Sequence, residues 1–304
     1  MGYEFKKVNC MVCGKDQTAY LGKRSPKSFT LPDELIAKVV KCTNCGLIFP
    51  NPMPFPDQQQ LKQNYSGPNG YFPTTITEKR LRFYKTILEG IERFTKKGKL
   101  LDVGCGRGEL LHLAQKRGWQ ACGAEISPSF AEYARGRFGL NVRVGEVKDL
   151  RFPDQEFDAI SLVGVLQHTY NPKDLLSELN RILKKDGVLF IEAMNGDSLL
   201  YKWGDLYYKL KGVDKTTNLS PTFPSYQIYG FSVVSLARLL QCTGFKIAKM
   251  QVKGGISRTE KHKAEGFLDK LLLWARAMVM VAAELLHQGQ VLVIYARKQG
   301  DLSR

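Results

Sequence analysis

The stretch LLDVGCGRGELL, residues 100–111, decides the fold. An apolar run reaches Asp102 and then opens into three glycines, Gly104, Gly106 and Gly108, directly before the helical pattern of residues 109–116. A strand that ends in a glycine-rich turn and leads into a helix is how an open α/β sheet builds a ligand site beyond the carboxyl end of a strand. The stretch therefore predicts a ligand at that edge.

The spacing of the glycines indicates which ligand. A dinucleotide site uses Gly-x-Gly-x-x-Gly and leaves the helix N-terminus open to a pyrophosphate. Here the third glycine comes one residue early, and Glu109 stands where a dehydrogenase keeps glycine. Glu109 and Asp102 would repel phosphate, so the pattern favours a ligand with a cationic end, such as S-adenosylmethionine. Glu125 ends the next strand, about 20 residues beyond the glycines, and can accept both ribose hydroxyls.

Strand and helix patterns alternate on both sides of this turn. Ser127-Pro128 and Asn171-Pro172 each look like an N-cap followed by proline at the first helical position. They begin helices that run to about Phe138 and through Leu183. The predicted strands are 99–103, 120–125, 142–145, 157–163, 188–194, 245–252 and 291–297. Such alternation predicts a mostly parallel sheet with helices on both faces.

Four of the seven cysteines are arranged in pairs. Cys10-x-x-Cys13 and Cys42-x-x-Cys45 are two knuckles, each followed by glycine. Two such turns close a tetrahedral site of four thiolates, which predicts a structural Zn²⁺ with no open coordination position. Two disulfides or a redox pair are the alternatives, and the lack of secretory context and the doubled motif argue against them.

The chain divides into three predicted parts. Residues 1–56 are a zinc-ribbon module that ends in a proline-rich linker, 57–98 are a helical lead-in, and 99–304 form the main domain. Residues 196–230 interrupt the main domain as a basic, aromatic insert that should overhang the site. A helix is also predicted at 267–286, either packed on the sheet or resting on a membrane surface.

Four segments together resemble the class I S-adenosylmethionine-dependent methyltransferases: LLDVGCGRG (100–108), ACGAEIS (121–127), VGEVKDLRFPDQEFDAI (144–160) and LKKDGVLFIEAMN (183–195). The resemblance covers about residues 100–297 and implies a Rossmann-like, seven-stranded sheet whose last strand runs antiparallel. The four-cysteine module followed by CGLIFPNP (45–52) resembles a zinc-ribbon branch whose members often act in sugar, polyketide or lipid-linked biosynthesis.

The resemblance also implies residue roles. The three glycines lie against the methionine part of the donor, and Asp102 faces its amine. Glu125 binds the ribose, and Glu146 and Val147 lie beside the adenine. The remaining residues predicted to line the donor are Cys105, Ile126 and Val163.

His168, in VLQHTYNP (165–172) after the fourth strand, is the candidate general base, because an unperturbed imidazole titrates near neutral pH. A loop-shaping or helix-capping role is the alternative. Relatives often carry Leu-Glu-His here, whereas this chain has Gln167, which removes a charge.

The net charge of +16 favours an anionic partner, with solubility alone as the alternative. Half of it, +8, falls in residues 196–304, where two basic segments, the insert and 252–263, should open on the site. We expect a small anionic acceptor that is nucleotide-linked, phosphorylated or lipid-linked, with peripheral membrane contact a further option. An RNA methyltransferase and a non-catalytic adaptor are the alternatives, and the oligomeric state is left open.

No apolar leader is evident, and the longest apolar-rich stretch, 271–286, is 16 residues long and carries Arg276 and Glu284. A spanning helix needs roughly 20 residues. We therefore expect a cytoplasmic protein.

Overall fold

The computed structural model describes residues 3–24, 37–57, 77–219, 227–254, 278–283 and 285–299. Several predicted features lie wholly or partly outside these residues: the lead-in at 58–76, Phe223 and Tyr226 of the insert, the basic segment from 255 to 263, and most of the helix predicted at 267–286.

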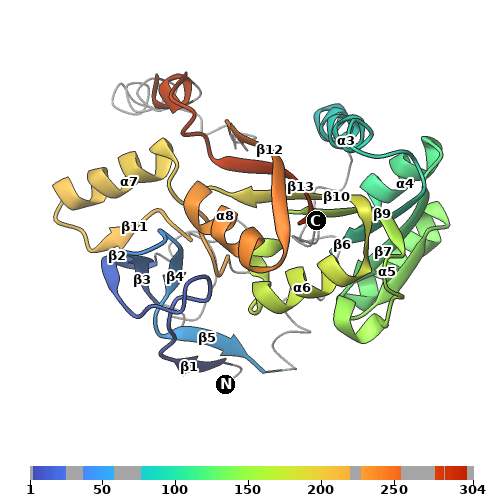
Figure 1. Cartoon of the computed structure of the whole chain (residues 1–304). Coiled ribbons are helices and arrows are strands. Elements are labelled where there is room, and N and C mark those ends of the chain that lie inside the picture. Colours follow the sequence, from blue (N-terminus) through green and yellow to red (C-terminus); the bar gives the residue numbers. More distant parts are fainter. Residues whose placement is uncertain are drawn as a thin grey trace.

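The main sheet has seven strands (Figure 1). Their spatial order is β12 (Phe245–Lys253), β13 (Val291–Lys298), β10 (Leu183–Met194), β9 (Phe157–Val163), β6 (Lys99–Val103), β7 (Gln120–Glu125) and β8 (Asn141–Val144). Strands β10, β9, β6, β7 and β8 pair in parallel, and β13 is antiparallel to both neighbours. The predicted mostly parallel, seven-stranded fold is confirmed.

Each face of the sheet is covered by helices. Helices α3 (Glu78–Ile91), α4 (Glu109–Lys116) and α5 (Pro128–Phe138) share one apolar core with the sheet. Helices α6 (Pro172–Ile182) and α8 (Val233–Cys242) share a second core on the other face. The central strands β6 and β9 are buried on both sides, which explains why their sequences read as apolar runs instead of alternating ones.

The local start signals act as expected. The Ser127 hydroxyl accepts a hydrogen bond from the N–H of Phe130, and Pro128 opens α5. Ser232 caps α8 in a reciprocal arrangement with Ser235. Asn171 occupies the N-cap of α6, although its side chain donates to Asp174. These caps place the loops that precede them along one edge of the sheet.

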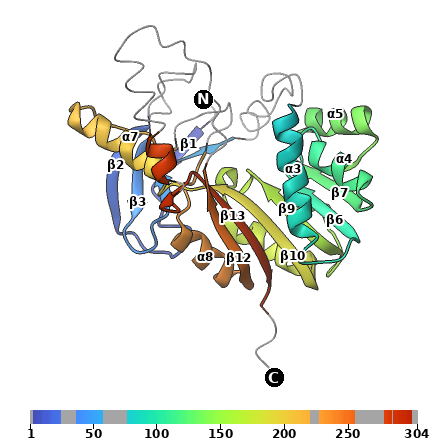
Figure 2. The ribbon, with the colours of Figure 1, turned by 90° about the horizontal axis from the view of Figure 1, so that it is seen from above.

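The cysteine-containing module forms its own sheet, which the insert completes. The strand order is β11 (Lys215–Thr216), β2 (Thr18–Arg24), β3 (Lys38–Cys42) and β4 (Ile48–Pro50). Strand β11 belongs to the insert and pairs in parallel with β2. In Figures 1 and 2 the module and the insert helix α7 (Leu199–Leu210) lie at the β12 end of the main sheet, opposite α4 and α5.

The proline-rich segment was expected to be a linker, and the structure shows a paired strand there. Residues Met53–Pro56 form β5, which pairs antiparallel with β1 (Tyr3–Lys6). Strand β5 offers few donors because two of its residues are prolines, which suits a short two-stranded edge. The division into 1–56, 57–98 and 99–304 stays a prediction, and the module and main domain share one apolar core that includes Leu47, Phe49 and Leu236.

None of the helices within the described ranges is both long and apolar enough to cross a membrane.

Candidate active site

The glycine turn lies between β6 and α4, at the carboxyl edge of the sheet. Gly104 has a φ of +65° and Gly108 a φ of +80°, values that favour glycine. Space is limiting as well, because a Cβ on Gly104 would lie 2.6 Å from Cγ2 of Val165. The loop therefore needs glycine for its backbone and for its packing against the segment after β9.

Glu125 holds this loop from the end of β7. Its two carboxylate oxygens accept hydrogen bonds from the N–H of Gly106 at 2.8 Å and the N–H of Ser127 at 2.9 Å. Burial raises the pKa of Glu125, and these two N–H donors oppose the shift. A carboxylate offers about four acceptor sites. The backbone of Ile126 also donates to Glu125, so part of this acceptor capacity remains for a ligand hydroxyl.

Asp102 is a buried acid beneath the turn. The Ser161 hydroxyl donates to it at 2.6 Å from the neighbouring strand β9. Burial raises the pKa of Asp102 to about 7, the nearby charges of Glu125 and Glu109 add to the increase, and the Ser161 hydrogen bond opposes it. A cation bound here would relieve the cost of keeping Asp102 ionised. The site thus favours a positively charged group.

Glu109 was predicted to repel phosphate, but its charge is already paired. It forms an ion pair with Arg107 at 2.7 Å, and both side chains are only 3% exposed. Arg107 also lies over the ring of Tyr133, 5.7 Å from its centroid. The charge of Glu109 is therefore balanced within the loop, and the preference for a cationic ligand rests on Asp102 and Glu125 instead.

A polar cluster that sequence reasoning missed lies beside Asp102. Arg80 of α3 donates to the hydroxyl of Tyr84 at 2.8 Å. The strand register places Glu192 and Asp102 on the same sheet face, and removal from solvent raises the pKa of Glu192 to about 7, opposed by the charge of Arg80. The signal was an acid inside the apolar run LFIEAM. The N-terminal part of α3 therefore brings a cation to Tyr84 and Glu192, and the charge of Asp102 also acts on Tyr84.

The residues predicted beside adenine follow β8 on the same edge. The N–H of Gly145 donates to the main-chain oxygen of Glu125 at 2.9 Å, which ties this loop to the end of β7. Val147 is buried, whereas Glu146 is exposed and lies 3.0 Å from Lys148. The other predicted residues on this edge are Cys105, which is buried, Val163, which is half-buried, and Ile126, which is exposed.

The four predicted metal ligands come together. The Sγ atoms of Cys10, Cys13, Cys42 and Cys45 all lie within 4.8 Å of one another, and two pairs are 3.4 and 3.5 Å apart. Four thiolates around one tetrahedral ion, at about 2.3 Å each, require sulfur separations of about 4 Å. The cluster therefore fits one metal ion of this coordination.

Backbone hydrogen bonds shape the two cysteine turns, and hydrogen bonding and burial shift the pKa values of their thiols. The N–H of Gly14 donates to the Cys10 carbonyl at 2.8 Å, and the N–H of Gly46 donates to the Cys42 carbonyl at 2.9 Å. Burial opposes ionisation of Cys13, but hydrogen bonds, chiefly from Asn44 and the Lys15 backbone, bring its pKa down to about 6. Burial raises the pKa of Cys10 to about 11. An ion at this site would have to displace that proton.

The loop after β9 carries the candidate base. Residues Leu166–His168 form a short 3-10 turn, in which His168 is half-buried. The main-chain oxygen of Gln167 accepts from the N–H of Ile228 at 2.8 Å and of Tyr229 at 3.1 Å. Gln167 Oε1 is buried and has no hydrogen-bond partner among the described residues. It is an unused acceptor beside the predicted base.

The cysteine module supports this same loop. The Tyr170 hydroxyl donates to the Pro54 carbonyl at 2.8 Å, and its ring packs 5.2 Å from that of Phe55. The Tyr229 hydroxyl donates to the Tyr170 carbonyl at 3.2 Å. Ser232 donates to the carbonyl of the predicted metal ligand Cys45 at 3.2 Å. The module, the 227–232 segment and the loop of His168 therefore form one connected wall.

The insert projects beside this wall. Asp205 of α7 accepts hydrogen bonds from the hydroxyls of Thr216 at 2.9 Å and Thr217 at 2.8 Å, which fixes the helix to β11. Trp203 and Tyr207 stack at 6.2 Å on α7. Its outer face exposes Leu206 and Leu210 next to lysines.

The fold is that of the class I S-adenosylmethionine-dependent methyltransferases. It has their strand order with one antiparallel strand, a glycine turn after the central strand β6 and an acid at the end of the next strand, β7. Within it, residues 101–191 match the methyltransferase domain family. Residues 101–191 are therefore a methyltransferase domain, and its fold is that of the class I enzymes, as the sequence predicted.

Two curated relatives illustrate the match. MJ1123 of Methanocaldococcus jannaschii is 33% identical over 132 residues, which cover 43% of this chain and 60% of that protein. The ubiquinone biosynthesis O-methyltransferase of Coxiella burnetii is 28% identical over 136 residues, covering 43% of this chain and 56% of the relative. The chain thus spans a little over half of the length of these two proteins.

Solved structures agree on the fold. A chain from the complex between the Haloferax volcanii Trm112 methyltransferase activator and a methyltransferase has a TM-score of 0.52 at 16% identity, covering 75% of this chain and 94% of that chain. The PH0226 protein of Pyrococcus horikoshii has a TM-score of 0.51 at 16% identity, and the match covers 78% of this chain and 99% of PH0226.

The raised pKa of Asp102 gives a prediction for Asp102→Asn. The ordinary value is 3.8 and the folded value is about 7, so the folded protein retains a proton that the unfolded chain releases between these values. The contribution of Asp102 to the free energy of unfolding is therefore fully present below about pH 4 and is lost as the pH rises through 7. Above pH 7 we expect the variant to be more stable than the parent protein by about 2–4 kcal/mol, and less so at pH 5.

Urea unfolding of the ligand-free protein at pH 5 and pH 8 measures this difference. Asp186→Asn, at an exposed position, is the matched control and should change stability little at either pH. An Asp102→Asn effect of equal size at both pH values would contradict the assignment.

Proposed function

We propose that the protein transfers a methyl group from S-adenosylmethionine to a small anionic acceptor in a biosynthetic reaction. The observation that carries the donor assignment is the pair of buried acids, Asp102 and Glu125, on either side of a glycine turn at the carboxyl edge of the sheet. Such a site suits a cationic nucleoside. The donor supplies an electrophilic methyl group, to which the acceptor forms a bond as the carbon–sulfur bond breaks.

The predicted donor residues then have distinct roles. Asp102 faces the amine, and the glycines let the backbone approach the methionine part. The remaining acceptor capacity of the Glu125 carboxylate binds the ribose hydroxyls. Glu146 and Val147 border the adenine. Arg80 is added to this set as a partner for the donor's carboxylate, since its charge acts at the Asp102 side of the sheet.

We assign the cysteine cluster a structural Zn²⁺. All four coordination positions are taken by sulfur, so the ion would have no place for a substrate or water. Its contribution would be to hold the β3–β4 knuckle, on which Ser232 and the 227–232 segment depend. The module would thereby shape the acceptor side of the site.

The proposal of a small anionic acceptor is supported by the charged and apolar side chains of α7. Lys202, Lys209 and Lys211 lie on or next to α7, and their net positive charge favours an anion. The exposed apolar side chains of α7 would suit a lipid-linked acceptor or a peripheral membrane contact. The relative named for ubiquinone biosynthesis supports a small biosynthetic acceptor. With an acceptor already positioned as a nucleophile, orientation would supply much of the rate.

His168 is proposed as the general base. Replacing it with alanine should lower kcat about 100-fold at pH 7, because a base in the transition state contributes about that much. The loss should shrink as the pH rises and the acceptor ionises on its own. Affinity for S-adenosylhomocysteine should stay within threefold.

His112→Gln is the matched control, since His112 of α4 stacks on Phe138 of α5, away from the loop after β9. A His168→Ala enzyme with an unchanged pH–rate profile would leave His168 a loop-shaping residue.

The function itself is tested with labelled donor. The protein is incubated with S-adenosylmethionine carrying a labelled methyl group and a metabolite extract, and labelled products are identified by mass spectrometry. We expect label in a small product retained by anion exchange. Label found only in RNA, and lost after ribonuclease treatment, would replace the proposal with the RNA alternative. Absence of donor binding by calorimetry would indicate an adaptor.

A further inference from the structure

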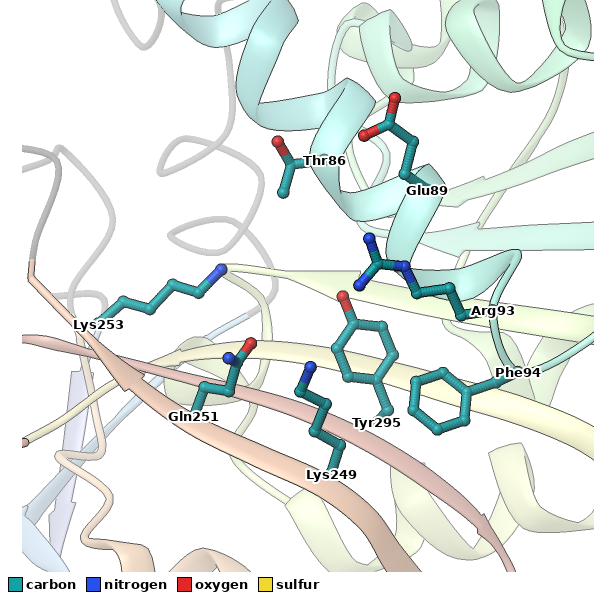
Figure 3. Close-up of a pocket in the computed structure, with 9 residues that line it drawn as sticks. Thr86, Glu89, Arg93, Phe94, Lys249, Gln251, Lys253 and Tyr295 are labelled. Carbon is teal, nitrogen blue, oxygen red and sulfur yellow. The ribbon is translucent and has the colours of Figure 1, made fainter.

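A hollow lies away from the glycine turn, between α3 and the outer strands β12 and β13 (Figure 3). It encloses about 170 Å³, enough for a group of several heavy atoms. Its lining includes Arg93 and Phe94 after α3, Lys249, Gln251 and Lys253 of β12, and Tyr295 of β13. None of these residues belongs to the predicted donor site.

The hollow carries an uncompensated positive charge. Arg93, Lys249 and Lys253 form no ion pair with any described residue. Glu89 is the acid in the lining, and it lies 3.8 Å from Lys85 on the same helix. In Figure 3 the charged ends of Lys249 and Lys253 lie around the same opening as the guanidinium of Arg93. Their mutual repulsion would be relieved by an anion.

The floor of the hollow is aromatic and well ordered by packing. Tyr295 stacks on Phe94 with ring centroids 4.9 Å apart and meets Phe190 edge-on at 5.2 Å. Gly90 of α3 has no side chain, which leaves room for the Tyr295 hydroxyl against the helix. Burial raises the pKa of Tyr295, although Arg93 opposes the shift, so the hydroxyl keeps its proton as a donor.

The donors around the opening suit one kind of ligand. Two ammonium groups, one guanidinium and the amide of Gln251 can together surround a tetrahedral oxyanion, and charge-assisted hydrogen bonds of this type are the strong ones. We propose that this hollow binds a phosphate-bearing ligand at a site separate from the methyl donor. The proposal does not depend on the identity of the acceptor.

Lysines on an outer strand also have a protective role, because charge on an exposed edge prevents pairing with another chain. That role depends on charge anywhere along β12, whereas a phosphate site needs the two lysines at the hollow. Lys246 is exposed, lies on the same strand and is not part of the lining, so it separates the two explanations.

The test uses the full chain saturated with S-adenosylhomocysteine and titrated with pyrophosphate in a calorimeter. We expect Lys249→Gln and Lys253→Gln each to weaken pyrophosphate binding about tenfold, the loss expected for one charge-assisted contact. Lys246→Gln should change it less than twofold. No pyrophosphate binding, or an equal loss in Lys246→Gln, would overturn the proposal, as would increased self-association of the two variants without any change in affinity.

A second arm identifies the source of the phosphate. Vesicles of phosphatidylcholine with and without phosphatidic acid are compared with soluble glycerol phosphate, using the parent protein and the Lys249→Gln/Lys253→Gln variant. If the parent protein binds one of these phosphate sources more tightly than the double variant does, the site is supported and that source is identified as membrane or soluble. If the parent protein and the variant bind both sources equally, the proposal is contradicted. Affinity for S-adenosylhomocysteine should be the same in all proteins, so failure here is distinct from failure of the donor assignment.

Discussion

Replacing Glu125 with alanine is expected to weaken binding of S-adenosylmethionine about 300-fold. The carboxylate is expected to bind both ribose hydroxyls, and a hydrogen bond to a charged group contributes about 1.5–3 kcal/mol. The substitution also leaves the N–H groups of Gly106 and Ser127 without their acceptor, which loosens the glycine turn. Calorimetric titration with S-adenosylhomocysteine measures the loss without turnover.

Two further variants make the experiment specific. Glu125→Gln keeps the shape and one acceptor oxygen, so its loss should be smaller than that of Glu125→Ala. Glu132→Gln, at an exposed position of α5, removes the same charge away from the site and should bind normally. Binding by Glu125→Ala within threefold of the parent protein would remove Glu125 from the donor site.

Loss of the metal from the cysteine cluster is expected to have the largest effect on stability. Cys45→Ser should eliminate one bound zinc per chain and lower the free energy of unfolding by about 5 kcal/mol or more, since structural zinc contributes about 10–16 kcal/mol in isolated fingers. The effect should reach the main domain, because Cys10, Cys42 and Cys45 belong to the same apolar core as α6 and α8.

Metal analysis and thermal unfolding with and without a chelator measure this prediction. Cys242→Ser changes an exposed thiol outside the cluster and should leave both zinc content and Tm unchanged. Amide exchange should rise first at residues 227–232 and 166–170, which the knuckle supports. A metal-free protein with the Tm of the untreated one would show that the cluster does not hold the fold together.

Much of the main domain was predictable because its signals are local. The predicted strands 99–103, 120–125 and 157–163 have the observed boundaries, as does the helix at 109–116. Buried parallel strands are short apolar runs, and caps such as Ser127 act within three residues. Each Cys-x-x-Cys pair was predictable for the same reason, since the turn places its two sulfurs by its own backbone, whereas the contact between Cys10 and Cys45 depends on the fold.

The sequence by itself determined the order of strands and helices, the glycine turn and the two Cys-x-x-Cys turns, since each is encoded by residues close together in the chain. Only the tertiary structure decided what those parts do to one another. Strand β11 joins the cysteine module across about 190 residues of sequence, Arg107 neutralises Glu109, and the charge of Arg80 acts on Glu192. The hollow beside Tyr295 likewise draws on three separate elements. Contacts of this kind depend on which faces meet after folding, and no period or spacing along the chain encodes that.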